Sequence, residues 1–357
     1  MKKSIPIKPT FEISSSSTSI KNKNCLIKLG GECNLHCKFC HSENHQYEFN
    51  PDIIDFIKQE KFTRVTFSGG EPLLYWDTIQ NIVNNLGSEF NYRMVSNLTL
   101  LTEDKISFLN ENKFLLCGSF DGKNGLRDSF PRPRWDLLSK VNNQGFAVTV
   151  YQENLNLRGL KTELDWLVSA NRLKKCQSFF PNFIHTTQNV EGSSTTLDTA
   201  KNYLLQLTPM VEVELISLLS SDEENPLRTR ALLNKCLQYW WIKKDYKGLR
   251  CANETMYPIA LDGRFLMCPY EHEFIGNIYT GMDFNKIEAI TPERCKVCPI
   301  FDVCKGSCWA NKTNHECYIA RKMNKWLNIV IDKWSAKNTL LEAIKIYKEL
   351  QLKNNFS

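Results

Sequence analysis

The sequence contains no hydrophobic run long enough to cross a bilayer. Its longest apolar stretches, such as YLLQL and LNIVI, fall far short of the roughly 20 residues that a transmembrane helix needs. The chain begins MKKSIPIKP, without the apolar segment of a secretory signal peptide. Basic runs are also missing, and a net charge of +6 over 357 residues gives no indication of nucleic-acid binding. The sequence thus predicts a cytoplasmic protein that has neither membrane nor nucleic acid as a partner.

Cysteine, by contrast, is abundant, with 14 residues in the chain. Disulfides do not persist in a reducing cytosol, so clustered cysteines indicate metal ligands or catalytic thiols. Ten of them fall into two groups, three at 33–40 and seven at 251–317. Cys25 and Cys117 lie in apolar, strand-like runs and are interpreted as small core residues.

Strand-like and helix-like segments alternate from residue 25 to about residue 185. The predicted strands are 25–29, 64–68, 92–97, 114–119, 146–152 and 176–184. The predicted helices between them are 51–60, 74–86, 102–112, 134–145 and 160–170. This order predicts parallel βα units, and six strands with ligand loops at their carboxyl ends suit a barrel or partial barrel.

The rest of the chain has a different character. Residues 195–245 look helical, residues 251–317 show little periodicity, and residues 319–353 read as one or two amphipathic helices. A segment such as 251–317 buries little apolar area and is predicted to fold around metal.

The stretch GGECNLHCKFC, residues 30–40, spaces three cysteines as Cys33-x3-Cys37-x2-Cys40. A cubane iron–sulfur cluster usually takes four thiolates, so three leave one iron open to another ligand. An amine and a carboxylate that chelate together suit that iron, and S-adenosylmethionine carries such a pair. One-electron cleavage of its C–S bond yields a 5′-deoxyadenosyl radical, which is chemistry of the cofactor. A zinc site is the alternative on spacing alone.

This loop, with Phe39 directly before its last cysteine, resembles that of the radical S-adenosylmethionine (radical SAM) superfamily. The second predicted strand supports the resemblance, because VTFSGGEPLL places Gly69, Gly70 and Glu71 at its end. In the family this motif contacts the methionine amino group, and its glycines allow close backbone approach.

Later segments of the resemblance imply further cofactor contacts. GSFDG, residues 118–122, matches a stretch whose serine and aspartate lie near the ribose and carboxylate, here Ser119 and Asp121. A plain Asx turn at Asp121 is the alternative. Arg132, in RDSFPRPR, is the candidate for pairing with the methionine carboxylate. Asn97 ends the third strand and either lines the pocket or forms a turn.

The second cysteine group is similar to the SPASM domain, which carries auxiliary clusters in many peptide-modifying radical SAM enzymes. Its pattern runs Cys251-x11-Gly263-x4-Cys268, Cys295-x2-Cys298-x5-Cys304-x3-Cys308, then Cys317. The resemblance implies one [4Fe-4S] cluster on Cys295, Cys298, Cys304 and Cys317, and a second on Cys251, Cys268 and Cys308. Tetrahedral zinc sites are the alternative. Cys236, the substrate or an open position would complete the second cluster.

The resemblance implies oxidative modification of a peptide or protein side chain, with crosslink formation as the main expectation. Sulfatase maturation is a weaker alternative, because those enzymes carry an aspartate where this chain has Pro269. Oxidation of a small molecule stays open, and a non-enzymatic metal-stabilised module is the least favoured. Asp262 and Glu271 are possible acid/base groups or exposed turn residues, so no catalytic residue is assigned. An external electron donor is required. A separate leader-peptide recognition partner, or the C-terminal helices, would recognise the peptide.

The expected architecture is an α/β partial (β/α)6 radical SAM barrel, a helical bridge, a SPASM domain and a C-terminal helix. The expected boundaries are a tail at 1–24, the core at 25–190, the bridge at 191–250, SPASM at 251–317 and the helical tail at 318–357.

Overall fold

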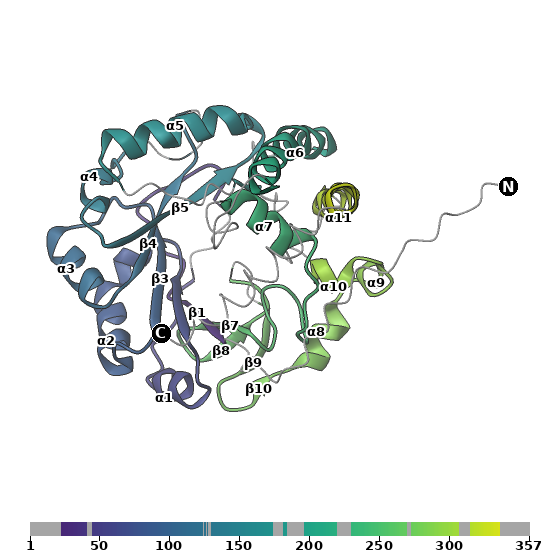
Figure 1. Cartoon of the computed structure of the whole chain (residues 1–357). Helices are drawn as coiled ribbons and strands as arrows, with labels where there is room; N and C mark the ends of the chain where they lie inside the picture. The colour runs from purple at the N-terminus through teal and green to yellow at the C-terminus, as the bar shows by residue number, and fades with distance from the viewer. Residues whose placement is uncertain are drawn as a thin grey trace.

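A computed structural model shows a mixed α/β fold built on one large sheet (Figure 1). The structure describes residues 23–40, 45–123, 125, 127, 130–173, 181–183, 196–219, 230–269, 273–306 and 315–335. Among the helices in these ranges, none combines the length and apolar character needed to span a membrane.

The described residues form a sheet of ten strands, in the spatial order β10-β9-β8-β7-β1-β2-β3-β4-β5-β6. The first six strands are β1 (Asn24–Lys28), β2 (Arg64–Ser68), β3 (Asn91–Ser96), β4 (Leu115–Phe120), β5 (Asn143–Val150) and β6 (Pro181–Phe183). They pair in parallel and in chain order. The remaining four are β7 (Met256–Ala260), β8 (Arg264–Leu266), β9 (Phe274–Asn277) and β10 (Gly281–Met282).

Helices connect the parallel strands on one side of the sheet. They are α1 (Asp52–Gln59), the 3-10 turn η1 (Pro72–Tyr75), α2 (Trp76–Leu86), α3 (Glu103–Glu111), α4 (Trp135–Leu138), the 3-10 turn η2 (Gln152–Asn154) and α5 (Leu157–Ala170). Parallel crossovers are almost always right-handed, so strands laid down in chain order place their helices on the same face. Figure 1 shows α1 to α5 around the outside of the curved strands.

Alternating apolar residues bind this outer face of the sheet to its helices. Val65 and Phe67 of β2, and Tyr92 and Met94 of β3, are almost completely buried. Phe67 stacks on Tyr92 at 6.3 Å between ring centroids, and Tyr92 stacks on Phe114 at 5.1 Å. This apolar layer holds β2 and β3 in one register and so aligns the loops at their carboxyl ends.

The predicted order of strands and helices is confirmed for the βα half of the described chain, with one correction. The expected helix 134–145 is wrong in extent, because α4 ends at Leu138 and β5 begins at Asn143. Gly145, read as a helix terminator, instead pairs with Cys117 of β4. Ladder pairing with a neighbouring strand overrides the local helix signal here. Residues 176–180 and 184 of the sixth expected strand lie outside the described ranges.

The cysteine-rich segment is less separate than predicted. β7 pairs in parallel with β1, from Asn24 opposite Met256 to Lys28 opposite Ala260, and thus extends the main sheet. The hairpin β7–β8 turns at Gly263, whose φ of 87° favours glycine. The sequence carried this signal as Asp-Gly between two apolar runs.

Helices close the open side of the molecule. They are α6 (Leu197–Leu219), α7 (Ala231–Trp240), α8 (Phe284–Ile290), α9 (Glu293–Lys296), α10 (Phe301–Cys304) and α11 (His315–Ser335). Because α11 begins at His315, Cys317 lies in its first turn, and the expected boundary after residue 317 falls inside a helix.

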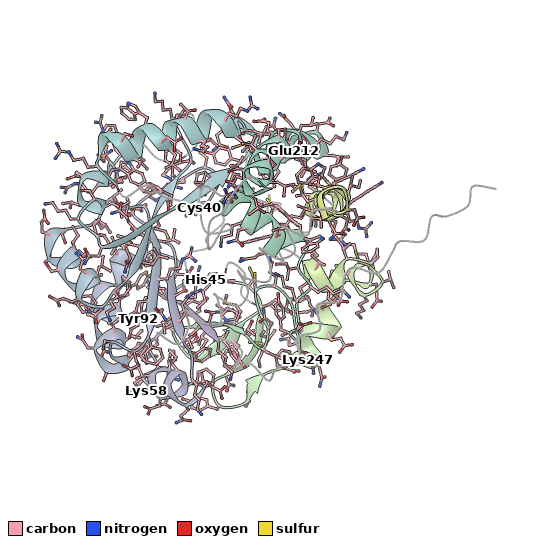
Figure 2. All side chains as sticks on the ribbon, viewed as in Figure 1. Cys40, His45, Lys58, Tyr92, Glu212 and Lys247 are labelled. Carbon is pink, nitrogen blue, oxygen red and sulfur yellow. The ribbon has the colours of Figure 1, made fainter. Side chains whose placement is uncertain are left out.

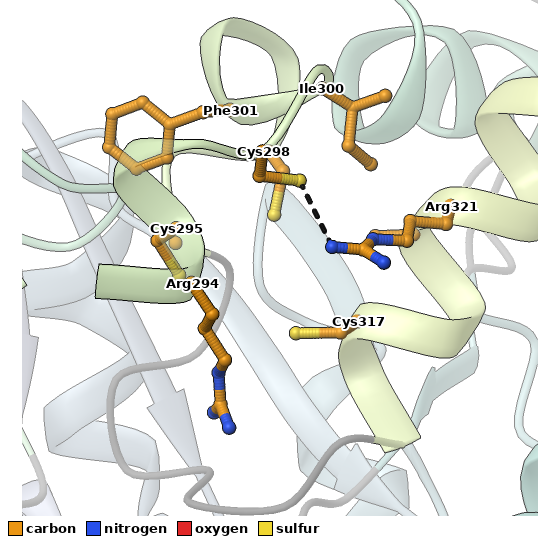
Figure 3. A pocket seen from close by; sticks show the side chains of 10 residues that line it. Arg294, Cys295, Cys298, Ile300, Phe301, Cys317 and Arg321 are labelled. Atoms are coloured by element: carbon orange, nitrogen blue, oxygen red, sulfur yellow. Dashed lines mark hydrogen bonds between the residues drawn. The ribbon is translucent and has the colours of Figure 1, made fainter. Parts of the chain in front are cut away.

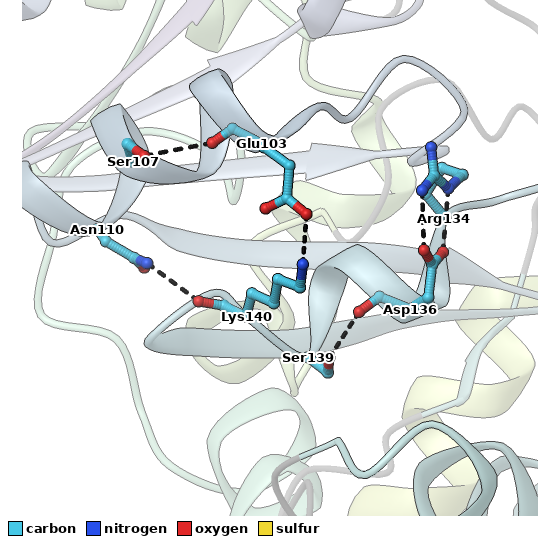
Figure 4. Close-up of polar contacts among 7 residues, drawn as sticks. All are labelled: Glu103, Ser107, Asn110, Arg134, Asp136, Ser139 and Lys140. Carbon is cyan, nitrogen blue, oxygen red and sulfur yellow. Dashed lines mark hydrogen bonds and ion pairs between the residues drawn. The ribbon is translucent and has the colours of Figure 1, made fainter.

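The outer surface carries exposed ion pairs that bridge consecutive elements. Lys140, after α4, pairs with Glu103 of α3, and its carbonyl accepts a 3.0 Å hydrogen bond from the Asn110 side chain (Figure 4). Arg134 and Asp136 form two hydrogen bonds of 3.0 and 2.8 Å. Such exposed pairs contribute at most about 1 kcal/mol each, so the apolar layer dominates the stability of this region.

Candidate functional site

The three cysteines of the loop after β1 differ in their exposure to solvent. Cys33 and Cys37 are half-buried, whereas Cys40 is exposed. The backbone N–H of Leu35 donates to Cys33 Sγ at 3.4 Å, and that of Cys40 donates to the Cys37 carbonyl at 2.9 Å. Figure 2 shows Cys40 near the middle of the ring of elements. The loop is thus shaped by its own hydrogen bonds, and none of its three thiols is completely buried.

The Gly-Gly-Glu turn after β2 packs directly on this loop. Gly70 N–H donates to the Gly30 carbonyl at 3.1 Å, and Glu71 N–H donates to the Glu32 carbonyl at 2.8 Å. A Cβ on Gly70 would lie 2.1 Å from the Glu32 carbonyl oxygen, which is far inside contact distance. The close backbone approach expected of these glycines is thus made to the cysteine loop, with Gly69 similarly placed against Gly30.

The Glu71 side chain joins the ends of β2 and β3. It is 1% exposed and accepts hydrogen bonds from Leu73 N–H at 3.0 Å, Ser96 Oγ at 2.8 Å and Asn97 N–H at 2.7 Å. Burial raises the pKa of this carboxyl, and the three donors oppose that rise. With all three donors committed inside the protein, Glu71 positions the loops around it.

Asn97 continues the connection to the first cysteine. Its Nδ2 donates to Asn34 Oδ1 at 3.0 Å and to Cys33 Sγ at 3.8 Å. Its Oδ1 accepts from Thr99 Oγ1 at 2.7 Å. This Oδ1 also accepts from Thr99 N–H at 2.9 Å, which is the turn named as one of the two expected roles, while the side-chain amide contacts the cysteine loop. Burial raises the pKa of the Cys33 thiol, with Glu71 and Cys40 adding to the rise.

A second network surrounds Phe39. The ring of Phe39 stacks on the ring of Tyr151, with 5.1 Å between their centroids. The Arg127 guanidinium lies 5.3 Å from the centroid of the Phe39 ring. Asp121 connects the two, because Arg127 Nε donates to its Oδ1 at 3.1 Å and Tyr151 OH donates to its Oδ2 at 2.8 Å. Asp121 is 4% exposed, so this is a buried ion pair.

Arg127 and Tyr151 are not among the contacts predicted from the sequence. Arg127 opens the RDSFPRPR stretch from which Arg132 was chosen. Arg132 is exposed, with its guanidinium 5.2 Å from the Phe130 ring centre. Ser119 is half-buried on β4. The sequence signal that could have indicated Arg127 is its spacing of six residues from Asp121. The only signal for Tyr151 is its position near the end of the predicted strand 146–152.

Four cysteines of the second group line one cavity. Cys295, Cys298, Cys304 and Cys317 lie in its wall with Arg294 and Arg321. Figure 3 shows the Cys298 and Cys317 sulfur atoms directed into this space, with Arg321 Nη2 donating to Cys298 Sγ at 3.6 Å. Burial raises the pKa of Cys304 to about 12, with smaller contributions from Glu316, Cys317 and Cys295.

This donor set fits an iron–sulfur cluster, in which each thiolate binds its own iron. Within the described ranges, no three Cys, His, Asp or Glu side chains converge on a point where they would share a single metal ion. The four thiols around a common cavity would hold a cubane, and Arg321 would neutralise part of its negative charge.

The remaining predicted cluster is only partly described. Cys251 is half-buried and Cys268 is 1% exposed, while Cys308 lies outside the described residues. Cys236 is completely buried on α7, and the charged groups nearest it include Glu214 of α6. It therefore belongs to the helical core, which argues against it as the missing ligand.

Of the candidate acid/base groups, only Asp262 lies within the described residues. Asp262 accepts from Arg264 Nε at 2.8 Å in the β7–β8 turn and is thus engaged in an ion pair. Glu271 lies outside them. Cys25 and Cys117 are buried, as predicted for core residues.

Comparison with known proteins agrees with this geometry, although no protein-family model matches the chain. It is 24% identical over 168 residues to the uncharacterized protein MJ0907 of Methanocaldococcus jannaschii, covering 41% of this chain and 59% of that protein. It is 22% identical over 323 residues to a cysteine-type anaerobic sulfatase-maturating enzyme of Clostridium perfringens, covering 77% of this chain and 85% of that enzyme.

Two groups of solved structures share the fold. The enzyme anSMEcpe, with bound AdoMet and the Cp18Cys peptide, matches with a TM-score of 0.60 and 16% identity, over 91% of this chain and 99% of that chain. Streptococcus suis SuiB, bound to its precursor peptide SuiA, matches with a TM-score of 0.56 and 17% identity, over 82% and 73% respectively. The predicted resemblance to radical SAM enzymes that modify peptides is confirmed by both comparisons.

Proposed function

We propose that this protein is a radical SAM enzyme that oxidatively modifies a side chain of a peptide or protein, with crosslink formation as the main outcome. The observation that carries the proposal is the cysteine loop, whose Cys33 contacts Asn97, which is in turn bound by the buried Glu71. Similarity to anSMEcpe and SuiB, each solved with a peptide, supports the substrate class.

In this proposal some residues bind the cluster and others position the loop that carries it. Cys33, Cys37 and Cys40 would hold a [4Fe-4S] cluster with one open iron for S-adenosylmethionine. When bound, the cluster and S-adenosylmethionine together supply a 5′-deoxyadenosyl radical. Glu71 and Asn97 fix the loop, and the Phe39–Tyr151 stack fixes its third cysteine. Arg127, rather than the exposed Arg132, is the buried cation beside the loop and the better candidate for the methionine carboxylate.

The C-terminal cysteines would serve as the electron outlet. A crosslink removes two hydrogens from the substrate: the adenosyl radical takes one as an atom, and the other leaves as a proton and an electron. Clusters held by Cys295, Cys298, Cys304 and Cys317, and by Cys251, Cys268 and Cys308, would accept that electron. An external donor supplies the first electron to the cysteine loop. The sequential strand order and outer helices support a partial barrel for the core. The cavity lined by Cys295, Cys298, Cys304 and Cys317 supports a SPASM arrangement for 251–317.

Anaerobic incubation tests the proposal. Enzyme reduced with dithionite should release 5′-deoxyadenosine from S-adenosylmethionine without substrate, and a Cys33→Ala/Cys37→Ala/Cys40→Ala variant should release none. The matched control is Cys25→Ala, which removes a buried thiol outside the loop. Equal release from the wild type and the triple variant would show that the loop does not generate the radical.

Sulfatase-type maturation is the second candidate, favoured by similarity over 77% of the chain. Pro269, where such enzymes carry an aspartate, is the point against it. Mass spectrometry of candidate peptides separates the two. A crosslinked product is lighter by about two mass units, carries no aldehyde and resists fragmentation between the joined residues. A product that reacts with hydroxylamine would contain formylglycine and reject crosslink formation.

A further inference from the structure

The inner face of the parallel sheet is more polar than its outer face, although Leu26, Val95 and Leu115 also lie on it. Parallel strands are usually buried on both faces and read as continuous apolar runs. Here β2, β3 and β4 alternate instead. Thr66, Ser68 and Ser119 point inward and are half-buried, while their neighbours Val65 and Phe67 form the outer core. These three side chains are thus partly accessible, whereas Lys28 and Cys117 on the same face are buried.

Two arginines stand at the amino-terminal end of this face. Arg64 begins β2 and is exposed, and Arg93 lies in β3 and is half-buried. Thr66 pairs with Arg93 and Arg64 pairs with Asn91, so the two arginines are diagonal neighbours on the same face. Arg93 Nη2 contacts Cys117 Sγ at 4.0 Å, which confirms its inward direction.

Two further cations approach from the other side of the interior. Burial lowers the pKa of Lys235 on α7, and the charges of Arg93, Arg64 and Arg250 lower it further. Although Arg64 as a whole is exposed, partial desolvation of its guanidinium lowers its pKa, and the charge of Arg93 adds to this effect. Arg250 is fixed by its guanidinium, which lies 3.8 Å from the Tyr239 ring centre. Lys235 therefore lies within the field of three arginines, two of which are the diagonal neighbours Arg64 and Arg93 on the sheet.

Within the described ranges, no carboxylate forms an ion pair with any of these four cations. Arg264 of β8, by contrast, has Asp262 as such a partner. Clustered like charges without a counter-ion are destabilising, and an anion bound among them relieves the repulsion.

The position of this cluster relates it to the cysteine loop. Arg93 precedes Asn97 by four residues on β3, which corresponds to about 13 Å along the strand. An extended peptide of about four residues covers that distance. The polar side chains Thr66, Ser68 and Ser119 line the face between the two ends. Because these cations come from two strands, a helix and a turn, they are better placed to bind several carboxylates of one peptide than a single small anion.

We propose that Arg64, Arg93, Lys235 and Arg250 form a binding site for acidic side chains of the substrate peptide, about four residues from the residue that is modified. The inference rests on the proposed function for its substrate class. It adds a specificity site that selects peptides with clustered Asp or Glu, and it places the peptide along the inner face of β2 to β4.

Fluorescence anisotropy with labelled hexaglutamate as the probe tests this site directly, without radical chemistry. The reconstituted protein should bind hexaglutamate, bind it more weakly as salt increases, and bind hexaserine poorly. Arg64→Gln/Arg93→Gln/Lys235→Gln should weaken binding roughly tenfold or more. The control Lys58→Gln/Arg158→Gln/Lys325→Gln removes the same three charges from exposed positions (Lys58 is labelled in Figure 2) and should change affinity less than about twofold.

Each other outcome overturns the proposal. Equal loss in both triple variants would mean attraction by net charge alone. Inorganic phosphate that competes as strongly as hexaglutamate would indicate a site for a small free anion. If the Arg64→Gln/Arg93→Gln/Lys235→Gln variant binds the peptide unchanged but shows a shifted reduction potential of its clusters, the cations instead balance the negative charge of a cluster near Cys251. If the triple variant does not fold, Arg93→Gln and Lys235→Gln singly should each weaken binding by about threefold. Substrate-free release of 5′-deoxyadenosine should persist in all variants, so its absence in wild type would reject the proposed function and not this site.

Discussion

The backbone N–H of Asn97 donates a 2.7 Å hydrogen bond to Glu71 Oε2, and this bond joins the carboxyl ends of β3 and β2 beneath the cysteine loop. Asn97 in turn reaches Cys33 through its side chain. A buried carboxylate thus connects two strands to the first of the three thiols.

Removal of the Glu71 carboxylate should destabilise the protein strongly. Glu71→Ala leaves two backbone N–H groups and the Ser96 hydroxyl without their acceptor in a buried space, which should cost about 3–5 kcal/mol of unfolding free energy. Glu71→Gln keeps one acceptor and should cost less. Urea denaturation of the metal-free protein measures both. Equal stability of Glu71→Ala and wild type would show that the network does not hold the loops.

Gly70→Ala should damage the cysteine loop more than the rest of the fold. The new Cβ would meet the Glu32 carbonyl at 2.1 Å, so the loop backbone must move. Iron bound at the loop should fall by about four atoms per chain while the C-terminal clusters remain. Gly281→Asn is the control, because Gly281 has φ of 81° with open space around it and Asn tolerates that conformation. Full iron content in Gly70→Ala would contradict the proposed packing.

Arg127 and Arg132 should differ sharply on substitution. Arg127→Gln leaves Asp121 as an unpaired buried charge, which should cost about 3–5 kcal/mol. Arg132→Gln, at an exposed position, should change stability by less than about 0.5 kcal/mol. Lys140→Gln, which breaks the exposed pair with Glu103, provides a second reference of similarly small effect. Chemical denaturation measures the free energy of unfolding of each variant. A similar loss of stability in Arg127→Gln and Arg132→Gln would show that Arg127 is not specifically required for the Asp121 ion pair.

Iron stoichiometry tests the two cysteine groups. Reconstituted wild type should bind about twelve irons, as three cubanes, and the Cys33→Ala/Cys37→Ala/Cys40→Ala variant about eight. A soluble Cys298→Ala/Cys304→Ala variant should lose the crosslinked product yet still cleave S-adenosylmethionine. Stoichiometric zinc without iron in anaerobically prepared protein would reject the cluster assignment. Wild-type product formation by the auxiliary variant would reject the electron-outlet role.

Glu214 of α6 should make stability depend on pH. Its Oε2 accepts a 2.7 Å hydrogen bond from Leu233 N–H, and burial raises the pKa of its carboxyl. A carboxyl whose pKa is higher in the folded state stabilises the fold below its unfolded pKa of about 4.3, and this stabilisation is lost as pH rises through the folded value. Glu214→Gln removes the titration. Measured from pH 4 upward, wild type should therefore lose stability relative to Glu214→Gln, and a constant difference would contradict the raised pKa.

Local patterns in the sequence were sufficient for most strands and helices of the βα half and for the spacing of both cysteine groups. They were not sufficient for the extent of α4 or for β7, which pairs with β1. Alternating apolar residues such as Val65 and Phe67 specify half-buried strands, because side chains in a strand alternate between faces. Fixed spacings bring Cys33, Cys37 and Cys40 onto one loop without any tertiary contact. Even the hairpin at Gly263 had a local signal.

Tertiary structure alone decided which long-range partners meet. Arg127 and Arg132 are equivalent in the sequence, yet only Arg127 reaches Asp121, because Tyr151 from the end of β5 completes that pocket. Cys236 is one more cysteine in the sequence, but helix packing buries it beside α6. The inward cations Arg64, Arg93 and Lys235 come from three separate segments, and only the register of β2 with β3 and the path of α7 bring their charges together. Contacts of this kind depend on how elements pack, which residue spacing along one segment does not encode.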